Sequence, residues 1–573
     1  MIEGYEGNAG ILMALLIVLI TVLMALFSVV SAIGILERCR VESGGVYYLI
    51  SYVLGARVGG AVGVVYVFGN AVACALFATG FGESMTSLTG IDTAGAPWAA
   101  RGIAVAVLAV LLVFNVAGVK WVVKLQLVLL LAILVAMLDL AVGSFVRAGG
   151  SAGGAAEPPA VVGWSRAAFR ENAAPNYTEG ESFFAVFGVV FSTATGVFAG
   201  INMSGDLRNP RRDIPAGSLA AIAVAASLYV GNVVVLGGTC ARAALRDDYM
   251  IAERVAALKV PWLVGLYVSS LSSCLGALYG APRILQSIAA EGTLPRVLAR
   301  GRGANSIPVA ALVVVVAAAL VFVLAGRVNS LAPIVTMPFM ATYACVDYAY
   351  FALAMTFDIQ RRREERLGKA AAAAGGAGAA PPRAGSAGDL DRLFPERLEN
   401  KGGDAAAAAA AALRPGVATF ERRPWRRGAA APPAAAAPRI ERQPRSWYSL
   451  LCNRWVALAA AIAKVVLAFA VDWAYALACV AIVGALYIYI GRAAPGLTPG
   501  VAEFSFVAWA RTGWRRCCRR HDDEDGEPYV VAPAHPGVAT TAAQLTEDND
   551  DFSARGRYHQ KTVVKGQPFV DSD

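Results

Sequence analysis

Charged side chains are scarce in this chain. Only 16% of its 573 residues are Asp, Glu, Lys or Arg, whereas an ordinary soluble protein has about 25%. The three histidines, His521, His535 and His559, all lie near the C-terminus, which leaves little for acid–base catalysis. No nucleophile elbow, P-loop, HExxH or Rossmann fingerprint is present. These absences argue against a set of soluble domains and against an enzyme.

The cysteines also lack a pattern. Nine cysteines are scattered through the chain, without CxxC or zinc-ligand spacing, so neither a zinc site nor a disulfide framework is expected. The net charge of +9 comes from Lys and Arg in short loops near apolar segments. That placement is typical of cytoplasmic loops in membrane proteins, so we expect neither a nucleic-acid partner nor a cofactor.

Long apolar runs dominate what is present. Residues 11–35 contain no charge and exceed the roughly 20 residues that a helix needs to cross a bilayer. Within lipid, such a segment must satisfy its own backbone hydrogen bonds, which favours helices. The sequence therefore predicts an all-α polytopic membrane protein in the plasma membrane or an internal membrane. We expect eleven spans, at about 11–35, 60–84, 101–119, 121–144, 182–206, 216–240, 261–286, 308–326, 331–356, 454–470 and 473–490.

Basic residues predict the orientation of these spans. Lys and Arg follow the first, third, fifth and seventh spans, which places those loops in the cytoplasm. The loop 145–181 is then external, and its triplet Asn176-Tyr177-Thr178 is a candidate glycosylation site. Four basic residues run against this assignment: Arg242, Arg246, Arg254 and Lys259.

Composition changes sharply after the ninth span. Residues 357–446 are rich in Ala, Pro, Gly and Arg without apolar periodicity, which predicts a disordered cytoplasmic linker. Two further membrane helices at 447–491 and a polar cytoplasmic tail at 492–573 follow it.

The span 182–206 has the composition of a broken helix. Glycines at 196, 200 and 205, together with hydroxyl and amide side chains, interrupt an otherwise apolar sequence, and glycine weakens a helix interior. A break inside the membrane exposes N–H groups that attract anions and C=O groups that attract cations. The alternative is a continuous helix that packs closely through its small residues.

Two other spans carry candidate ion ligands. Ser269, Ser272 and Ser273 share one helical face and offer hydroxyl oxygens to an alkali cation; alternatively, they bond to carbonyls of the preceding turn. Asp347 lies inside the span 331–356, where a carboxylate is costly and therefore a functional candidate. Its alternative role is that of a buried acid bonded to nearby tyrosines.

Four stretches resemble the cation–chloride cotransporters of solute carrier family 12, within the broader amino acid–polyamine–organocation superfamily. They are Gly44–Ser51, Gly69–Ser84, Gly200–Leu207 and Gly280–Gln286. The resemblance implies two inverted five-helix repeats whose first helices are broken at the substrate site. Residues 182–356 match one repeat, whereas 1–144 contain four spans, so the first repeat is expected to lack its opening helix.

The resemblance also implies site residues. The anion would bind backbone groups of Gly196, Val197 and Phe198 together with Tyr343. For cations, the potassium-site threonine corresponds to Thr195 and the paired serines of sodium-coupled members correspond to Ser272 and Ser273. A tyrosine of the potassium site is replaced by Phe77.

We therefore expect a secondary active transporter of cation–chloride symport type that works by alternating access, with chloride and alkali cations as its transported ions. One alternative is a carrier of organic solutes, such as amino acids, polyamines or nucleotide-like compounds, on the same scaffold. Another is a non-transporting membrane partner of related transporters. A homodimer and a heteromer with such relatives are both compatible with the sequence.

Overall fold

The computed structural model gives the arrangement of most of the chain. It describes residues 2–39, 44–90, 97–117, 119–146, 160–207, 209–248, 250–301, 307–325, 328–374, 451–493, 500–502 and 504.

Each of the eleven predicted spans is helical. The predicted division of the last pair is found, because α17 and α18 separate at Asp472; α4 and α5 lie on either side of residue 118, which is outside the described residues. The helices are α1 (Ile2–Arg38), α3 (Ala56–Thr89), α4 (Pro97–Ala117), α5 (Val119–Val146), α7 (Phe183–Phe191) with α8 (Ala199–Asn202), α9 (Pro210–Thr239), α12 (Lys259–Ala290), α13 (Val309–Ala325), α14 (Val328–Ala374), α17 (Arg454–Val471) and α18 (Trp473–Ala493).

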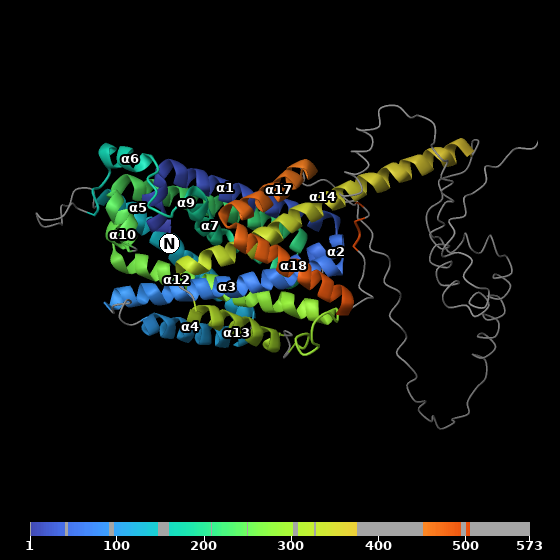
Figure 1. Cartoon of the computed structure of the whole chain (residues 1–573), viewed down its shortest axis with the longest axis horizontal. Helices are drawn as coiled ribbons and strands as arrows, with labels where there is room; N and C mark the ends of the chain where they lie inside the picture. Colours follow the sequence, from blue (N-terminus) through green and yellow to red (C-terminus); the bar gives the residue numbers. More distant parts are fainter. Residues whose placement is uncertain are drawn as a thin grey trace, which may run out of the picture. The chain divides into compact units, whose positions relative to one another are not determined.

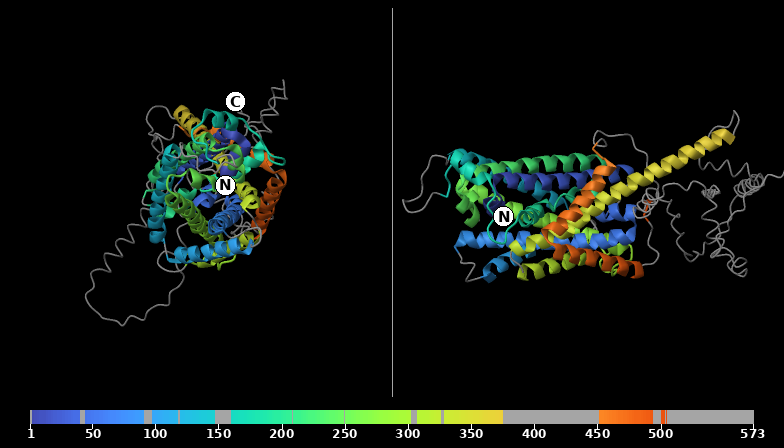
Figure 2. Two further views of the ribbon diagram at one scale, coloured as in Figure 1. Left: turned by 90° about the vertical axis from the view of Figure 1, so that its left-hand side faces the viewer. Right: turned by 45° about the horizontal axis from the view of Figure 1, so that its top comes forward.

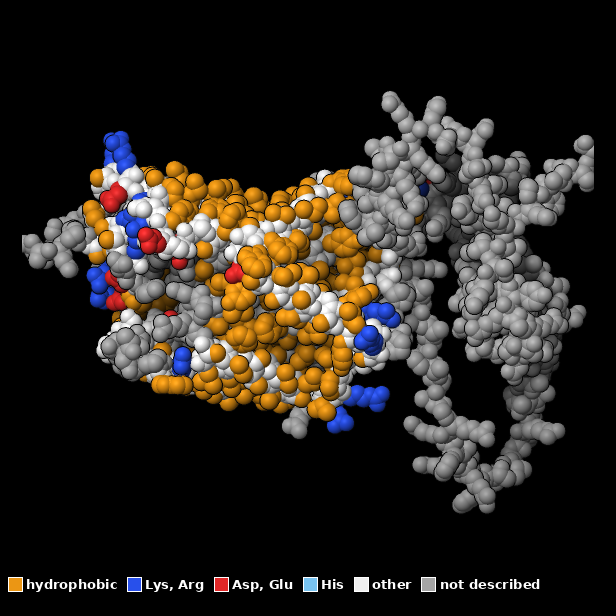
Figure 3. All heavy atoms as spheres, viewed as in Figure 1, with side chains coloured by type: hydrophobic (Ala, Val, Ile, Leu, Met, Phe, Trp, Pro, Cys, Tyr) orange, Lys and Arg blue, Asp and Glu red, His pale blue; other side chains and the backbone are white. Residues whose placement is uncertain are grey.

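The described residues contain nine segments that are long and apolar enough to cross a membrane. The other two predicted spans are α13, which has 17 residues, and α14, which has 47 and includes Asp347 among its polar residues. On the face shown in Figure 3, apolar side chains cover most of the middle, and charged side chains gather toward the two ends. The protein is thus a multi-pass helical membrane protein.

Short helices cap the two ends of this bundle. At one end, here called the α6 end, lie α6 (Arg166–Ala173), α10 (Arg242–Asp247) and α11 (Ile251–Val255). At the other, the α2 end, lies α2 (Gly45–Leu54), which no apolar run predicted because it is too short to span a bilayer (Figure 1). Gly44 and Gly55 bracket α2 with φ values of 136° and 94°, a backbone conformation that favours glycine.

Helices from the two halves of the chain pair with each other. Helix α1 packs against α9, α3 packs against α12, and α4 packs against α13. These long helices run side by side in one bundle, and α3 lies among α2, α12, α14 and α18 (Figures 1 and 2). Further contacts between the halves are made by α5 with α12 and by α3 with α13, so both halves of the chain form one bundle.

Helix α14 corrects one predicted boundary. The apolar span was expected to end at 356 and a disordered linker to begin at 357, but the helix continues to Ala374. Arg361 and Glu365, which pair across one turn at 2.8 Å, lie in this extension. Residues 375–446 of the predicted linker, residues 447–450 of the segment that follows it, and the tail after 504 lie outside the described residues.

The basic residues that ran against the predicted orientation have local partners at the α6 end. Arg254 pairs with Asp248 at 2.9 Å, and Lys259 pairs with Glu253 at 3.3 Å. Arg242 and Arg246 donate instead to backbone carbonyls, including that of Gly7. Burial and the neighbouring Arg246 charge lower the pKa of Arg242, while Glu171 opposes this shift. Such pairing explains how positive charge is accommodated on the face predicted to be external.

Candidate ion-binding site

The predicted break in the span 182–206 is present. Helix α7 ends at Phe191 and passes into a 3₁₀ turn, Ser192–Ala194; turns follow, and α8 begins only at Ala199. The hydroxyls of Ser192 and Thr193 donate to carbonyls three residues earlier, each at 2.7 Å, and such bonds compete with regular helix geometry. Because α8 has only four residues, its dipole is small, so a bound ion would depend on individual backbone groups.

Open space adjoins the break. Gly196 is exposed, and a Cβ added to it would meet no atom within 4 Å. Its neighbours Thr195 and Phe198 are buried. A small ion could therefore reach the backbone at Gly196 without displacing a side chain.

Tyr343 of α14 lies against this break. Its buried hydroxyl is 2.8 Å from the carbonyl oxygen of Ala194 and 3.0 Å from that of Thr195. The ring of Phe198 packs edge-on against the Tyr343 ring, with centroids 4.8 Å apart. The structure thus brings Thr195, Phe198 and Tyr343 together, although no local sequence feature links α14 to this segment.

The serines of α12 lie apart from that group. Ser269 donates to the carbonyl of Leu266 at 2.8 Å, which is the alternative role considered from the sequence. Ser272 is half-buried and Ser273 is exposed. Within the described residues, no hydrogen bond connects these three serines to the broken helix. Their proposed cation role therefore rests on the family resemblance.

Asp347 has a partner that the sequence did not identify. Its carboxylate pairs with the ammonium group of Lys464 on α17, and both side chains are 0% exposed. Ser28 and Ser31 of α1 lie beside the same carboxylate. The lysine already balances the aspartate charge, which weakens the expectation that Asp347 binds an alkali cation. We also find no cluster of three metal-ligating His, Cys, Asp or Glu residues among those described.

The predicted glycosylation residue is well exposed. Asn176 lies after α6, its backbone N–H donates to the carbonyl of Asn8 at 2.9 Å, and Arg246 binds its carbonyl. These contacts use only backbone atoms of Asn176.

If this face is external, the wild-type protein should carry a glycan at Asn176 that a glycosidase removes. Asn176→Gln should abolish this glycan, so that the variant migrates faster than the wild type on a denaturing gel. Thr178→Ala should do the same because it destroys the acceptor triplet. Tyr177→Phe leaves the triplet intact and should keep the slower band. A wild-type protein without glycan at the cell surface would contradict the predicted modification of Asn176.

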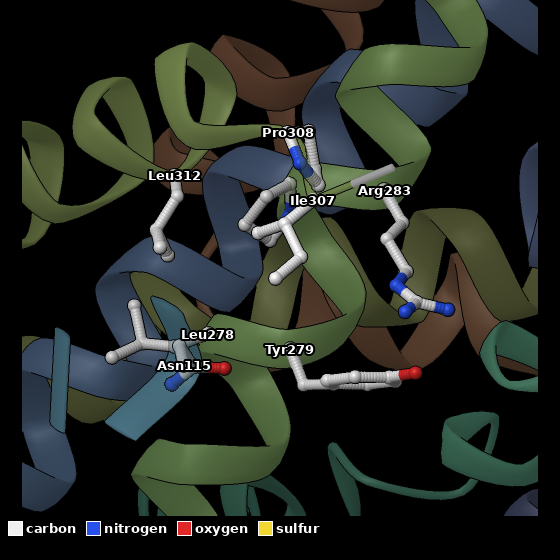
Figure 4. Close-up of a pocket in the computed structure, with 8 residues that line it drawn as sticks. Asn115, Leu278, Tyr279, Arg283, Ile307, Pro308 and Leu312 are labelled. Atoms are coloured by element: carbon white, nitrogen blue, oxygen red, sulfur yellow. The ribbon is translucent and has the colours of Figure 1, made fainter. Parts of the chain in front are cut away.

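A cavity lies on another side of α12. It is an open hollow between the end of α4, residues 278–283 of α12 and the start of α13, with about 320 Å³ of empty space when open solvent at its mouth is counted (Figure 4). Arg283 stacks on Tyr279, with its guanidinium carbon 4.2 Å from the ring centroid. The described lining contains none of the predicted ion-site residues. It consists of Asn115, Leu278, Tyr279, Pro282, Arg283, Ile307, Pro308 and Leu312.

Comparisons with known proteins agree with this architecture. Residues 6–373 match the family model described as amino acid permease. Solute carrier family 12 member 8 of Xenopus laevis is 39% identical over 653 aligned positions, covering 99% of this chain and 88% of that protein. The Homo sapiens member 8 is 37% identical, covering 98% and 90%. Solute carrier family 12 member 2 of Homo sapiens is 31% identical over 390 positions, covering 60% and 32%.

Proposed function

Because this chain belongs to the amino acid permease family and to solute carrier family 12, it is a secondary membrane transporter and not an enzyme, and we propose that it carries chloride together with an alkali cation. The observation that supports this proposal most directly is the broken helix beside Tyr343. It places the Tyr343 hydroxyl against the backbone of the break, next to Gly196, whose position has open space beside it.

The anion would bind at the start of α8. We assign it to the backbone N–H groups of Gly196, Val197 and Phe198 and to the hydroxyl of Tyr343. That hydroxyl lies within bonding distance of two carbonyls, but it has a single hydrogen and donates to one partner at a time. It could therefore donate to an anion after losing one neutral hydrogen bond.

The cation would bind carbonyl and hydroxyl oxygens near the same break. Thr195 contributes from the broken helix, and Ser269, Ser272 and Ser273 would contribute from α12. Among the described residues no hydrogen bond joins these serines to the break, so their part in the proposal rests on the family resemblance. Asp347 has a smaller role in this proposal, because it pairs with Lys464.

Transport of an organic solute remains the second candidate. Phe77, on α3, stands where the family's potassium site has a tyrosine, so one oxygen ligand is missing. A site with fewer oxygen ligands for potassium is compatible with a different transported solute.

Reconstituted vesicles distinguish these two functions. With the purified full chain, uptake of radioactive chloride should require sodium or potassium on the same side of the membrane. Replacing external chloride by gluconate should in turn reduce uptake of the radioactive alkali cation. Chloride-independent uptake of an amino acid or polyamine, with no coupled chloride flux, would favour the second candidate.

A further inference from the structure

Asn202, the last residue of α8, is hydrogen-bonded to two other helices through its side chain. Its Oδ1 accepts from the backbone N–H of Val46 in α2 at 3.3 Å. Its Nδ2 donates to the hydroxyl of Tyr66 in α3 at 3.0 Å. Both bonds join segments more than one hundred residues apart in the chain. The second half of the broken helix is therefore fastened to α2 and α3 by one amide.

Two glycines make room for this amide. A Cβ added to Gly45 would lie 2.6 Å from Oδ1 of Asn202, and Gly45 also has a φ of +59°. A Cβ added to Gly280 of α12 would lie 3.3 Å from Nδ2. Larger residues at either position would crowd the amide, so its slot is formed by α2, α3 and α12 together.

The slot is also in contact with the candidate ion site. The Tyr66 ring packs edge-on against Phe339, with centroids 5.3 Å apart. Phe339 in turn lies 6.0 Å from the Tyr343 ring, again edge-on. Tyr343 binds the carbonyls at the break. A continuous row of packed side chains therefore runs from Asn202 to the break in the helix.

We propose that Asn202 is a latch that closes the α2 end of the transport path. Alternating access moves one group of helices against another around a central site. When α8 moves away from α3 and α12 to open this end, the amide must leave its slot and both hydrogen bonds must break. This proposal depends only on the chain being a secondary transporter, whichever solute it carries. Asn202 is then a positioning residue for the conformational change.

The reporter for this opening is a cysteine at Ser287 of α12. A Cβ at Gly44, at the start of α2, would lie 3.5 Å from the Ser287 hydroxyl, so α2 closely approaches this position. In the Ser287→Cys protein, a membrane-impermeant thiol reagent is applied from the α2 side of inverted vesicles. Mass spectrometry of the digested protein then gives the labelling rate at residue 287 alone.

Loss of the latch should accelerate this labelling. One neutral hydrogen bond corresponds to about a two- to tenfold shift in an equilibrium. We therefore expect about a two- to tenfold faster rate in Tyr66→Phe and about a five- to hundredfold faster rate in Asn202→Ala. Gly280→Ala should also accelerate labelling, whereas Gly276→Ala should not, because its Cβ would lie an ordinary 3.7 Å from Gln126.

Two controls make the outcome decisive. Cys74 and Cys274 are buried between α3 and α12, so they stay unlabelled unless the protein unfolds. An unchanged rate at residue 287 in both Tyr66→Phe and Gly280→Ala, with Cys74 protected, would overturn the latch. Because labelling needs no ion gradient, that result is separate from the flux measurement: absence of chloride-coupled flux would refute the proposed function and leave the latch standing.

Discussion

Replacing Lys464 by methionine is expected to destabilise the folded protein by about 3–5 kcal/mol, because it leaves the Asp347 carboxylate buried without a counter-charge. Both side chains are 0% exposed, and they join α14 to α17. The affected contact therefore holds one of the last two membrane helices to the bundle. Heating the detergent-solubilised protein and measuring the fraction that stays monodisperse would reveal the loss.

A double variant separates charge from packing. Asp347→Leu with Lys464→Met removes both charges and retains similar volume, and such replacements of buried ion pairs are often neutral or stabilising. It should therefore recover most of the stability lost in Lys464→Met. Its hydrophobic side chains would still face Ser28 and Ser31, which lie beside the carboxylate in the wild type.

The matched control uses an exposed lysine of the same chain. Lys259 pairs with Glu253 at 3.3 Å, but its side chain is 62% exposed. Solvent screening limits such a pair to about 0–1 kcal/mol, so Lys259→Met should have little effect. Equal stability of Lys464→Met and Lys259→Met would show that the buried pair does not hold α17 in place.

This pair also shows where inference from sequence ends. Asp347 could be singled out because a carboxylate is unusual in an apolar span such as 331–356. Lys464 could be singled out in the same way, because a lysine is unusual in the apolar span 454–470. They are 117 residues apart, with the predicted linker between them, and only the folded arrangement of α14 and α17 makes them partners. The same limit applies to Asn202, whose glycine slot comes from α2 and α12.

Local features were easier to predict. Apolar length alone located the spans, because backbone hydrogen bonds leave few other structures possible in lipid. Glycine and hydroxyl content also predicted the break after Phe191. The end of α14 was misplaced because the apolar run stops near 356, while helix formation continues through residues such as Arg361 and Glu365 that favour helices without being apolar.

Replacing Tyr343 by phenylalanine is expected to raise the chloride concentration needed for half-maximal transport. A hydrogen bond to an ion contributes about 1.5–3 kcal/mol, and a neutral one about 0.5–1.5 kcal/mol. Because the hydroxyl lies within bonding distance of the carbonyls of Ala194 and Thr195, it must lose one neutral bond when it turns to an anion. The net loss is then about 1–1.5 kcal/mol, or about a five- to thirteenfold weaker affinity.

Surface expression and a matched variant complete this experiment. Tyr350 is another buried tyrosine of α14, but its hydroxyl donates to the carbonyl of Cys452 at 3.0 Å, away from the break. Tyr350→Phe should leave the chloride dependence of transport unchanged, even if it lowers stability slightly. If Tyr343→Phe and Tyr350→Phe gave the same chloride dependence as the wild type at equal surface expression, the anion would not bind Tyr343. Because the phenol hydroxyl is the one side-chain donor assigned to the anion, binding would then have to depend on the backbone of Gly196–Phe198 alone.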